Sequence, residues 1–83
     1  MPDANATPAV DVEVDATGLS CPLPVIELAK AVGRLEVGQS VRLLATDPAA
    51  KVDVPVWCRM QRHDLRGQAQ RDTVWVFEVR KAH

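Results

Sequence analysis

The chain has too few cysteines for a disulfide-stapled fold, with two in 83 residues. Small secreted domains that depend on disulfides carry several pairs, so reduced thiols and a cytoplasmic location are expected. No apolar run approaches the ~20 residues of a membrane span. The N-terminus also lacks the basic segment and apolar stretch of a signal peptide. These absences predict one small soluble domain without a membrane partner.

Aromatic residues make up only 4% of the chain, whereas hydrophobic residues make up 47%. The core is therefore expected to consist of Val, Leu, Ile and Ala. The formal net charge of −1 provides no global attraction to nucleic acid, so direct nucleic-acid binding is not expected. Arg59, Arg62 and Arg66 recur at helical spacing. If the helix persists that far, they share one face, which is either solvated or a docking surface for an acidic partner.

Hydrophobic periodicity predicts the element order β-α-β-α-β-β. Strands are expected over residues 10–15, 40–45, 68–71 and 74–79, with a flexible tail over 1–9 and the domain over 10–81. Two helices in this order must cover one face of the sheet. The predicted fold is an α/β (α+β) two-layer sandwich, with both helices on one face of a four-stranded mixed sheet.

Each predicted helix has an apolar stripe and a stop signal. The first begins near Pro22–Pro24 and ends at Gly33 or Gly38. The second spans about 53–61, with Pro55 in its first turn, and the segment 65–67 breaks it. The stripes expected to be buried are Val25, Ile26, Leu28, Ala29, Val32 and Leu35 in the first helix, and Val52, Val56 and Met60 in the second.

Cys21 lies where a strand pattern ends and a helix pattern begins. The positive end of a helix dipole favours a thiolate. Prolines suit a first helical turn but contribute no N–H, so only Leu23, Val25 and Ile26 can donate there, and a modest shift towards thiolate is expected. Pro24 occupies the place of the second cysteine in a Cys-x-x-Cys redox motif, which argues against dithiol chemistry. Cys21 is therefore interpreted as a reactive thiol.

The other candidate residues have structural interpretations beside functional ones. Cys58 is interpreted as a packing residue, with a role in sulfur relay or sensing as the alternative. His63 is either a general base or a hydrogen-bonding group at a helix end, where protonation would be favoured. Asp47 and Asp53 are paired acid/base carboxylates or, as favoured here, turn and cap residues. The spacing of Cys and His does not match a zinc site, so no metal is expected.

Four motifs occur in order along the chain. They are Gly18-Leu19 with Cys21-Pro22-Leu23-Pro24, then Asp47-Pro48, then Asp53-x-Pro55-x-Trp57-Cys58, and finally His63-Asp64-Leu65. In these motifs and in its element order, the chain resembles the TusA/SirA-like sulfur-carrier proteins, whose signature is Cys-Pro-x-Pro at the start of the first helix. The resemblance spans roughly residues 12–81.

This resemblance implies a carrier that holds sulfane sulfur as a persulfide on Cys21, without another cofactor. The carrier would act as a protein substrate in a relay rather than as a free-standing enzyme. A cysteine desulfurase or a rhodanese would supply the sulfur, and an acceptor protein would use it for tRNA thiolation, molybdenum-cofactor supply or sulfur oxidation. Two alternatives stay open: a regulatory module that docks RNA or protein through the arginines, and a redox sensor that pairs Cys21 with Cys58.

Overall fold

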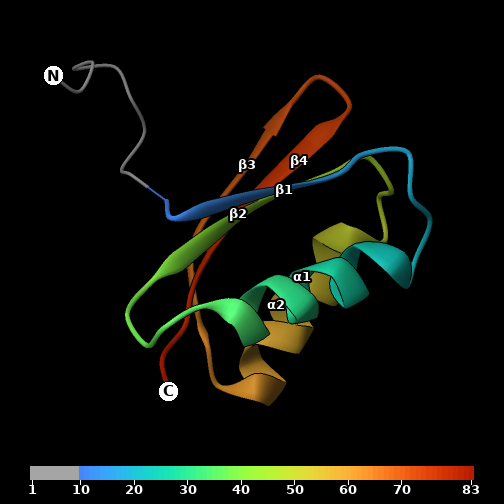
Figure 1. Ribbon diagram of the computed structural model, residues 1–83. Coiled ribbons are helices and arrows are strands. Elements are labelled where there is room, and N and C mark those ends of the chain that lie inside the picture. Colours follow the sequence, from blue (N-terminus) through green and yellow to red (C-terminus); the bar gives the residue numbers. More distant parts are fainter. Residues whose placement is uncertain (1–9) are drawn as a thin grey trace, which may run out of the picture.

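The computed structural model describes residues 10–83, and the predicted tail over residues 1–9 lies outside this described part. The chain forms two helices and four strands in the predicted order (Figure 1). The elements are β1 (Val12–Ala16), α1 (Leu23–Arg34), β2 (Ser40–Ala45), α2 (Ala50–Gln61), β3 (Asp64–Arg71) and β4 (Val74–Arg80). Within residues 10–83, no helix is both long and apolar enough to cross a membrane.

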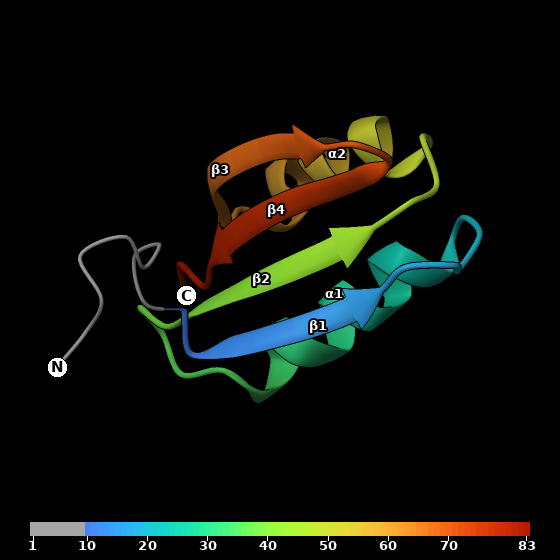
Figure 2. The same ribbon diagram turned by 90° about the horizontal axis from the view of Figure 1, so that it is seen from above.

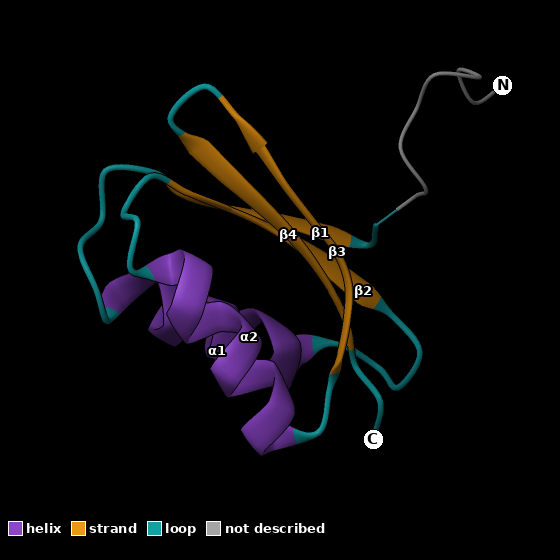
Figure 3. Ribbon diagram, turned by 180° about the vertical axis from the view of Figure 1, so that it is seen from behind, coloured by secondary structure: helices purple, strands orange, loops and turns teal. Residues whose placement is uncertain are grey.

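The four strands form one mixed sheet in the order β1-β2-β4-β3 (Figure 2). β1 and β2 are parallel, and Val14 aligns with Leu43. β4 is antiparallel to both β2 and β3, and it places Phe77 opposite Leu43 and Gln68. Both helices cover the same face of this sheet, so the molecule has two layers (Figure 3). The predicted two-layer α+β sandwich is confirmed.

The core lies between the two layers and is mainly aliphatic. The sheet contributes alternate residues, because successive side chains of a strand point to opposite faces. Helix α1 contributes Leu28 and Val32, as predicted, and Leu35 follows directly after its end. The buried hydrophobic residues are Ala16, Leu28, Ala31, Val32, Leu35, Val41, Leu43, Ala45, Ala50, Val54, Cys58, Phe77 and Val79.

The stripe predicted for α1 is partly wrong. Ile26 is 41% exposed, whereas Pro24 and Ala31 are buried. The helix also does not end at a glycine, because its last residue is Arg34 and Leu35 adopts an extended conformation. Leu35 is buried in the core directly after the end of the helix.

The apolar stripe predicted for α2 faces solvent. Val52, Val56 and Met60 are exposed, and the buried residues are Ala50, Val54 and Cys58. Residues two positions apart lie about 200° apart on a helix, so these two sets occupy opposite sides. Both sets repeat at i, i+4, so periodicity alone could not tell which of them is buried, and the prediction selected the exposed set.

Helix α2 begins three residues earlier than predicted. The carbonyls of Asp47 and Pro48 accept hydrogen bonds from the N–H groups of Ala50 and Lys51, so the turn itself starts the helix. Pro55 therefore lies inside the helix rather than in its first turn.

The segment 65–67 is a strand and not a helix breaker. Helix α2 ends at Gln61, and Arg62 adopts a left-handed conformation with φ of 60°. β3 then begins at Asp64, with a register shift between Leu65 and Gly67. The strand predicted over residues 68–71 is confirmed, but it begins four residues earlier than predicted. Its first part was missed because most side chains of β3 are exposed at the sheet edge, where hydrophobic periodicity gives no signal.

Burial of Cys58 predicts a measurable cost for a polar replacement. Its side chain is 2% exposed, so Cys58→Ser would bury a hydroxyl among apolar groups. We expect the free energy of unfolding to fall by about 1–3 kcal/mol. Urea unfolding followed by tryptophan fluorescence measures the change. Cys21→Ser is the matched control, because Cys21 is exposed, and an equal loss in both variants would contradict the prediction.

Candidate functional site

The candidate site lies at the edge of the sheet where β1 and β2 end. The carboxyl ends of parallel strands meet at one edge, which is a common place for functional loops in α/β folds. Here the loop after β1 and the loop after β2 lie together (Figure 2). The Gly18 N–H donates to Thr46 Oγ1 at 2.8 Å, and the Cys21 N–H donates to Asp47 Oδ2 at 2.7 Å. These two bonds fix the backbone that carries the thiol.

The residues around Cys21 shape the turn into α1. Gly18 has a φ of 80°, a conformation that glycine adopts without strain. Leu19 packs against the core, and Pro24 is fully buried in the first turn of the helix. Pro22 occupies the N-cap position, and its bond to Cys21 is cis. The turn is therefore anchored on both sides of an exposed Cys21.

Two of the three N–H donors expected near the sulfur are already engaged. The Leu23 N–H donates to the Ser20 carbonyl at 2.9 Å, and the Ile26 N–H donates to the Pro22 carbonyl at 3.1 Å. The first turn of α1 thus offers little hydrogen bonding to a thiolate, which removes part of the expected stabilisation.

The Cys21 thiol instead contacts a carboxylate from the other helix. Its Sγ–H donates to Asp53 Oδ2 at 2.7 Å. This hydrogen bond raises the pKa of Cys21, and desolvation and the charges of Asp53 and Asp47 add to the effect. The expected shift towards thiolate is therefore wrong in direction, because the Asp53 carboxylate accepts a hydrogen bond that only the protonated thiol can donate.

Asp47 has the turn role expected from its position. Its Oδ1 accepts from the Ala49 N–H at 2.9 Å, and its Oδ2 accepts from the Cys21 N–H. These two backbone hydrogen bonds lower the pKa of Asp47. Asp53, by contrast, caps nothing, since its side chain binds the sulfur. The assignment of Asp53 to a cap or turn is therefore wrong.

Cys58 is a core residue, as predicted. Burial raises the pKa of its thiol to about 11, so it is protonated at neutral pH. Both cysteines are free, one exposed and one buried. A redox pair would require the Cys58 sulfur to leave the core, so the geometry does not favour the sensor hypothesis.

His63 is a hydrogen-bonding group near the end of α2, as predicted. Its N–H donates to the Cys58 carbonyl at 2.9 Å, and its Nδ1 accepts from the Ala82 N–H at 3.1 Å. Its ring stacks on His83 with a centroid distance of 4.7 Å. Desolvation, followed by the charges of His83 and Lys81, lowers the pKa of His63. The expectation that its protonation would be favoured is wrong.

The three arginines do not share a helix face. All three are exposed, but Arg59 lies on α2, Arg62 is its C-cap, and Arg66 lies on β3. The helix stops before the predicted face is complete. Cys21 and Asp53 lie near the starts of α1 and α2, whereas Arg59 lies in the last turn of α2 and the other two arginines follow that end of the helix.

Exposed apolar side chains occur instead near the starts of the two helices that carry the site. Leu23 and Ile26 lie in the first turns of α1, and they are 45% and 41% exposed. Val52 and Val56 lie within one turn of Asp53 on α2 and are 62% and 41% exposed. We call Leu23, Ile26, Val52 and Val56 the apolar rim. Such a grouping around a reactive group is typical of a surface that contacts another protein.

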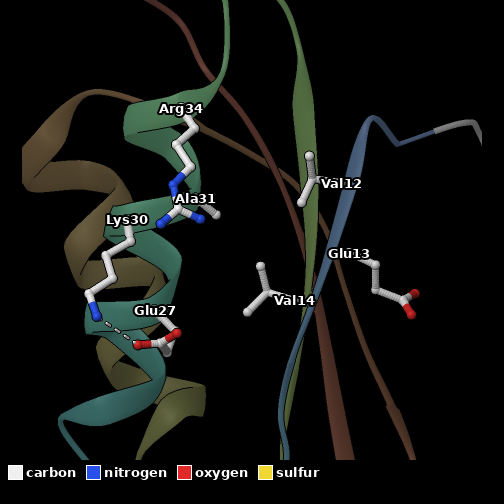
Figure 4. Close-up of a pocket in the computed structure, with 7 residues that line it drawn as sticks. All are labelled: Val12, Glu13, Val14, Glu27, Lys30, Ala31 and Arg34. Atoms are coloured by element: carbon white, nitrogen blue, oxygen red, sulfur yellow. Dashed lines mark hydrogen bonds and ion pairs between the residues drawn. The ribbon is translucent and has the colours of Figure 1, made fainter.

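Two surface hollows lie away from the sulfur. One, of about 340 Å3, lies between β1 and α1 and is lined by Val14 and the Glu27–Lys30 ion pair. Val14 points from β1 towards α1, whereas Glu13 points away (Figure 4). A second hollow, of about 530 Å3, lies on the sheet face that the helices leave uncovered. Neither lining includes Cys21, and among residues 10–83 no group of three side chains could hold a metal ion.

Comparison with known proteins agrees with the fold. The family model described as sulfurtransferase TusA matches residues 12–81. The chain belongs to the TusA family. A sulfur carrier protein TusA from Pseudomonas entomophila strain L48 is 39% identical over 71 residues, which cover 86% of this chain and 89% of the relative.

A solved structure supports the TusA-family fold independently. The SirA-like protein from Desulfitobacterium hafniense superposes with a TM-score of 0.77 at 23% identity. The match covers 87% of this chain and 99% of the other. At this identity the likeness concerns the fold, and it agrees with the observed two helices on a four-stranded mixed sheet.

Sequence reasoning missed the contact between Asp53 and the sulfur. The two residues are 32 positions apart, and the parallel pairing of β1 and β2 brings the loop that carries Cys21 beside the start of α2. One signal was available, because Asp53 belongs to the third of the motifs that pointed to the TusA family. Because this motif and the one around Cys21 pointed to the same family, Asp53 could have been proposed as a residue of the site.

Proposed function

We propose that this TusA-family protein carries sulfane sulfur as a persulfide on Cys21. The exposed thiol on an anchored turn is the observation that supports the proposal most directly. Persulfide transfer requires a sulfur that a second protein can reach, and a buried cysteine such as Cys58 does not meet this requirement. No other cofactor takes part in the proposed chemistry.

The proposed step exchanges sulfur between two thiols. The donor's persulfide bond breaks at the sulfane sulfur, and a bond forms between that sulfur and Cys21 Sγ. The donor leaves as a thiol, and the Cys21 proton supplies the hydrogen that the donor thiolate needs. The reaction is a thiol exchange without net oxidation, since no electrons are gained from or lost to a third reagent.

We place the protein in a cytoplasmic relay between two proteins. A cysteine desulfurase or a rhodanese would supply the sulfur, and tRNA thiolation, molybdenum-cofactor supply or sulfur oxidation would consume it. The apolar rim supports such protein partners, because its exposed side chains lie near the starts of the two helices that carry the site and gain by being covered. Arg59, Arg62 and Arg66 remain a predicted steering group, although they do not form one face.

The apolar rim predicts a selective loss of transfer from a protein donor. Val56→Asn should slow sulfur loading from a cysteine desulfurase several-fold, because it places a polar amide where the partner would cover apolar surface. Loading from a small sulfane donor should not change. Loading rates with both donors, measured by intact mass, test this. Val37→Asn is the matched control, since Val37 is exposed and lies outside the rim; equal effects of the two variants would contradict the prediction.

Intact mass spectrometry tests the proposed function itself. The protein is incubated with a cysteine desulfurase and cysteine, and reductant is omitted. We expect a mass increase of one sulfur atom that a thiol reductant removes. A protein whose mass stays unchanged, or one that loses two hydrogens as an internal disulfide, would contradict the carrier proposal.

A further inference from the structure

The environment of the Cys21 sulfur is acidic. Asp53 Oδ2 accepts a hydrogen bond from the Cys21 Sγ–H at 2.7 Å, and Asp47 Oδ2 accepts one from the N–H of the same residue. Among residues 10–83, the charged groups that act on the thiol are these two carboxylates, one from α2 and one from the loop before it. A cysteine that must attack another sulfur is usually found beside a cation or a free helix N-terminus. Here the neighbouring groups are carboxylates, which disfavour the thiolate.

Asp53 is the acidic residue in the first turn of α2, where its charge favours the helix dipole, but that role does not require its carboxylate to contact the sulfur. The hydrogen bond to Cys21 is the only one its side chain makes within the described residues. Its backbone N–H donates to the Ala49 carbonyl at 2.9 Å, so the helix holds the residue without help from the carboxylate. Asp53 is also only half-buried, which leaves it no role in the core.

We propose that Asp53 is a positioning residue that holds the unloaded Cys21 as a protonated, slowly reacting thiol, and that sulfur loading breaks this contact. The part of this inference that concerns sulfur loading rests on the proposed carrier function. An ionised carboxylate is an acceptor only, so it binds the thiol and repels the thiolate. The unloaded carrier is thereby protected from electrophiles and oxidants, which react with thiolates.

The loading step itself removes the hydrogen bond between Cys21 and Asp53. When the terminal sulfur bonds to Cys21 Sγ, the Sγ atom loses its hydrogen, and this hydrogen passes to the donor's thiolate. The Sγ atom can then no longer donate to Asp53. Two acceptor atoms without a shared proton repel each other at 2.7 Å, so the loaded side chain moves away from the carboxylate. Loading thereby exposes the terminal sulfur to an acceptor.

The pH profile of thiol alkylation tests this role. The rate at which iodoacetamide modifies Cys21 is measured between pH 6 and pH 11 in wild type and in Asp53→Asn. The raised pKa of Cys21 is attributed mainly to Asp53, so the variant should react several-fold faster at pH 7, with its midpoint at lower pH. The two rates should converge at high pH, where both thiols are ionised. Cys58→Ser in both backgrounds confines the signal to Cys21.

Two further variants separate this role from general effects of charge and structure. Asp72→Asn removes the same charge from the turn between β3 and β4, and its profile should coincide with that of wild type. Asp53→Glu keeps a carboxylate on α2 and should restore part of the raised midpoint. An Asp53→Asn profile identical to wild type, or faster by one factor at every pH, would overturn the proposal. The assay uses no sulfur donor, so such a result would leave the carrier function untouched.

Discussion

Cys21→Ser is expected to eliminate sulfur loading while the protein stays folded. A serine hydroxyl cannot form a persulfide, and at this position it can still donate to Asp53 as the thiol does. Cys58 cannot substitute, because it is 2% exposed and burial raises the pKa of its thiol to about 11. Loading from a cysteine desulfurase, read by intact mass and by the label on each cysteine, should fall to the background of the assay.

Cys58→Ser is the matched control for this loss. It should load sulfur as wild type does, provided that the temperature is kept below its lowered unfolding midpoint. Sulfur carried equally well by Cys21→Ser would show that the exposed turn is not the carrier site. A loss in both variants would indicate a relay through the two thiols, which the burial of Cys58 does not favour.

Phe77→Ala is expected to have the largest effect on stability. Phe77 is fully buried in β4, where it lies between Leu43 and Gln68 of the neighbouring strands. Removing a buried phenylalanine ring costs about 3–5 kcal/mol, since apolar burial is lost and a cavity remains. A domain of this size has a free energy of unfolding of roughly 4–12 kcal/mol. Urea unfolding followed by circular dichroism should therefore show a much lower midpoint.

Val76→Ala tests whether this cost reflects the core or the strand. Val76 precedes Phe77 and points to the sheet face that the helices leave uncovered, where it is only partly buried. The alanine lowers β propensity in the same strand, but it opens no closed cavity, so we expect a loss of about 1 kcal/mol or less. Similar losses for the two variants would mean that strand propensity, not core packing, dominates.

The sequence by itself determined the element order, the two-layer fold and the identity of the exposed thiol. Alternation in β2 and β4 and the apolar repeat in α1 are local signals, and local signals set secondary structure where one face is buried. The motif around Cys21 is also contiguous. Its glycine and prolines shape a turn through their own backbone preferences, so no distant contact was needed to recognise it.

Local signals failed where two arrangements satisfied the same pattern or where the side chains were polar. The stripe of α2 was placed on the wrong side, because Val52, Val56 and Met60 repeat as regularly as Ala50, Val54 and Cys58. The end of α2 at Gln61 was missed, so Arg66 was assigned to a helix face rather than to the edge strand β3.

Only the tertiary structure decided the chemistry of the sulfur. The parallel pairing of β1 with β2 brings two loops together, and Asp47 and Asp53 reach Cys21 from 26 and 32 residues away. The hydrogen bond to Asp53, followed by desolvation and the two charges, raises the pKa of the thiol, whereas the local sequence indicated a helix terminus that would lower it. The effect of a charge or an acceptor on the pKa of a thiol depends on their distance in space, and for residues far apart in the sequence only the fold sets that distance.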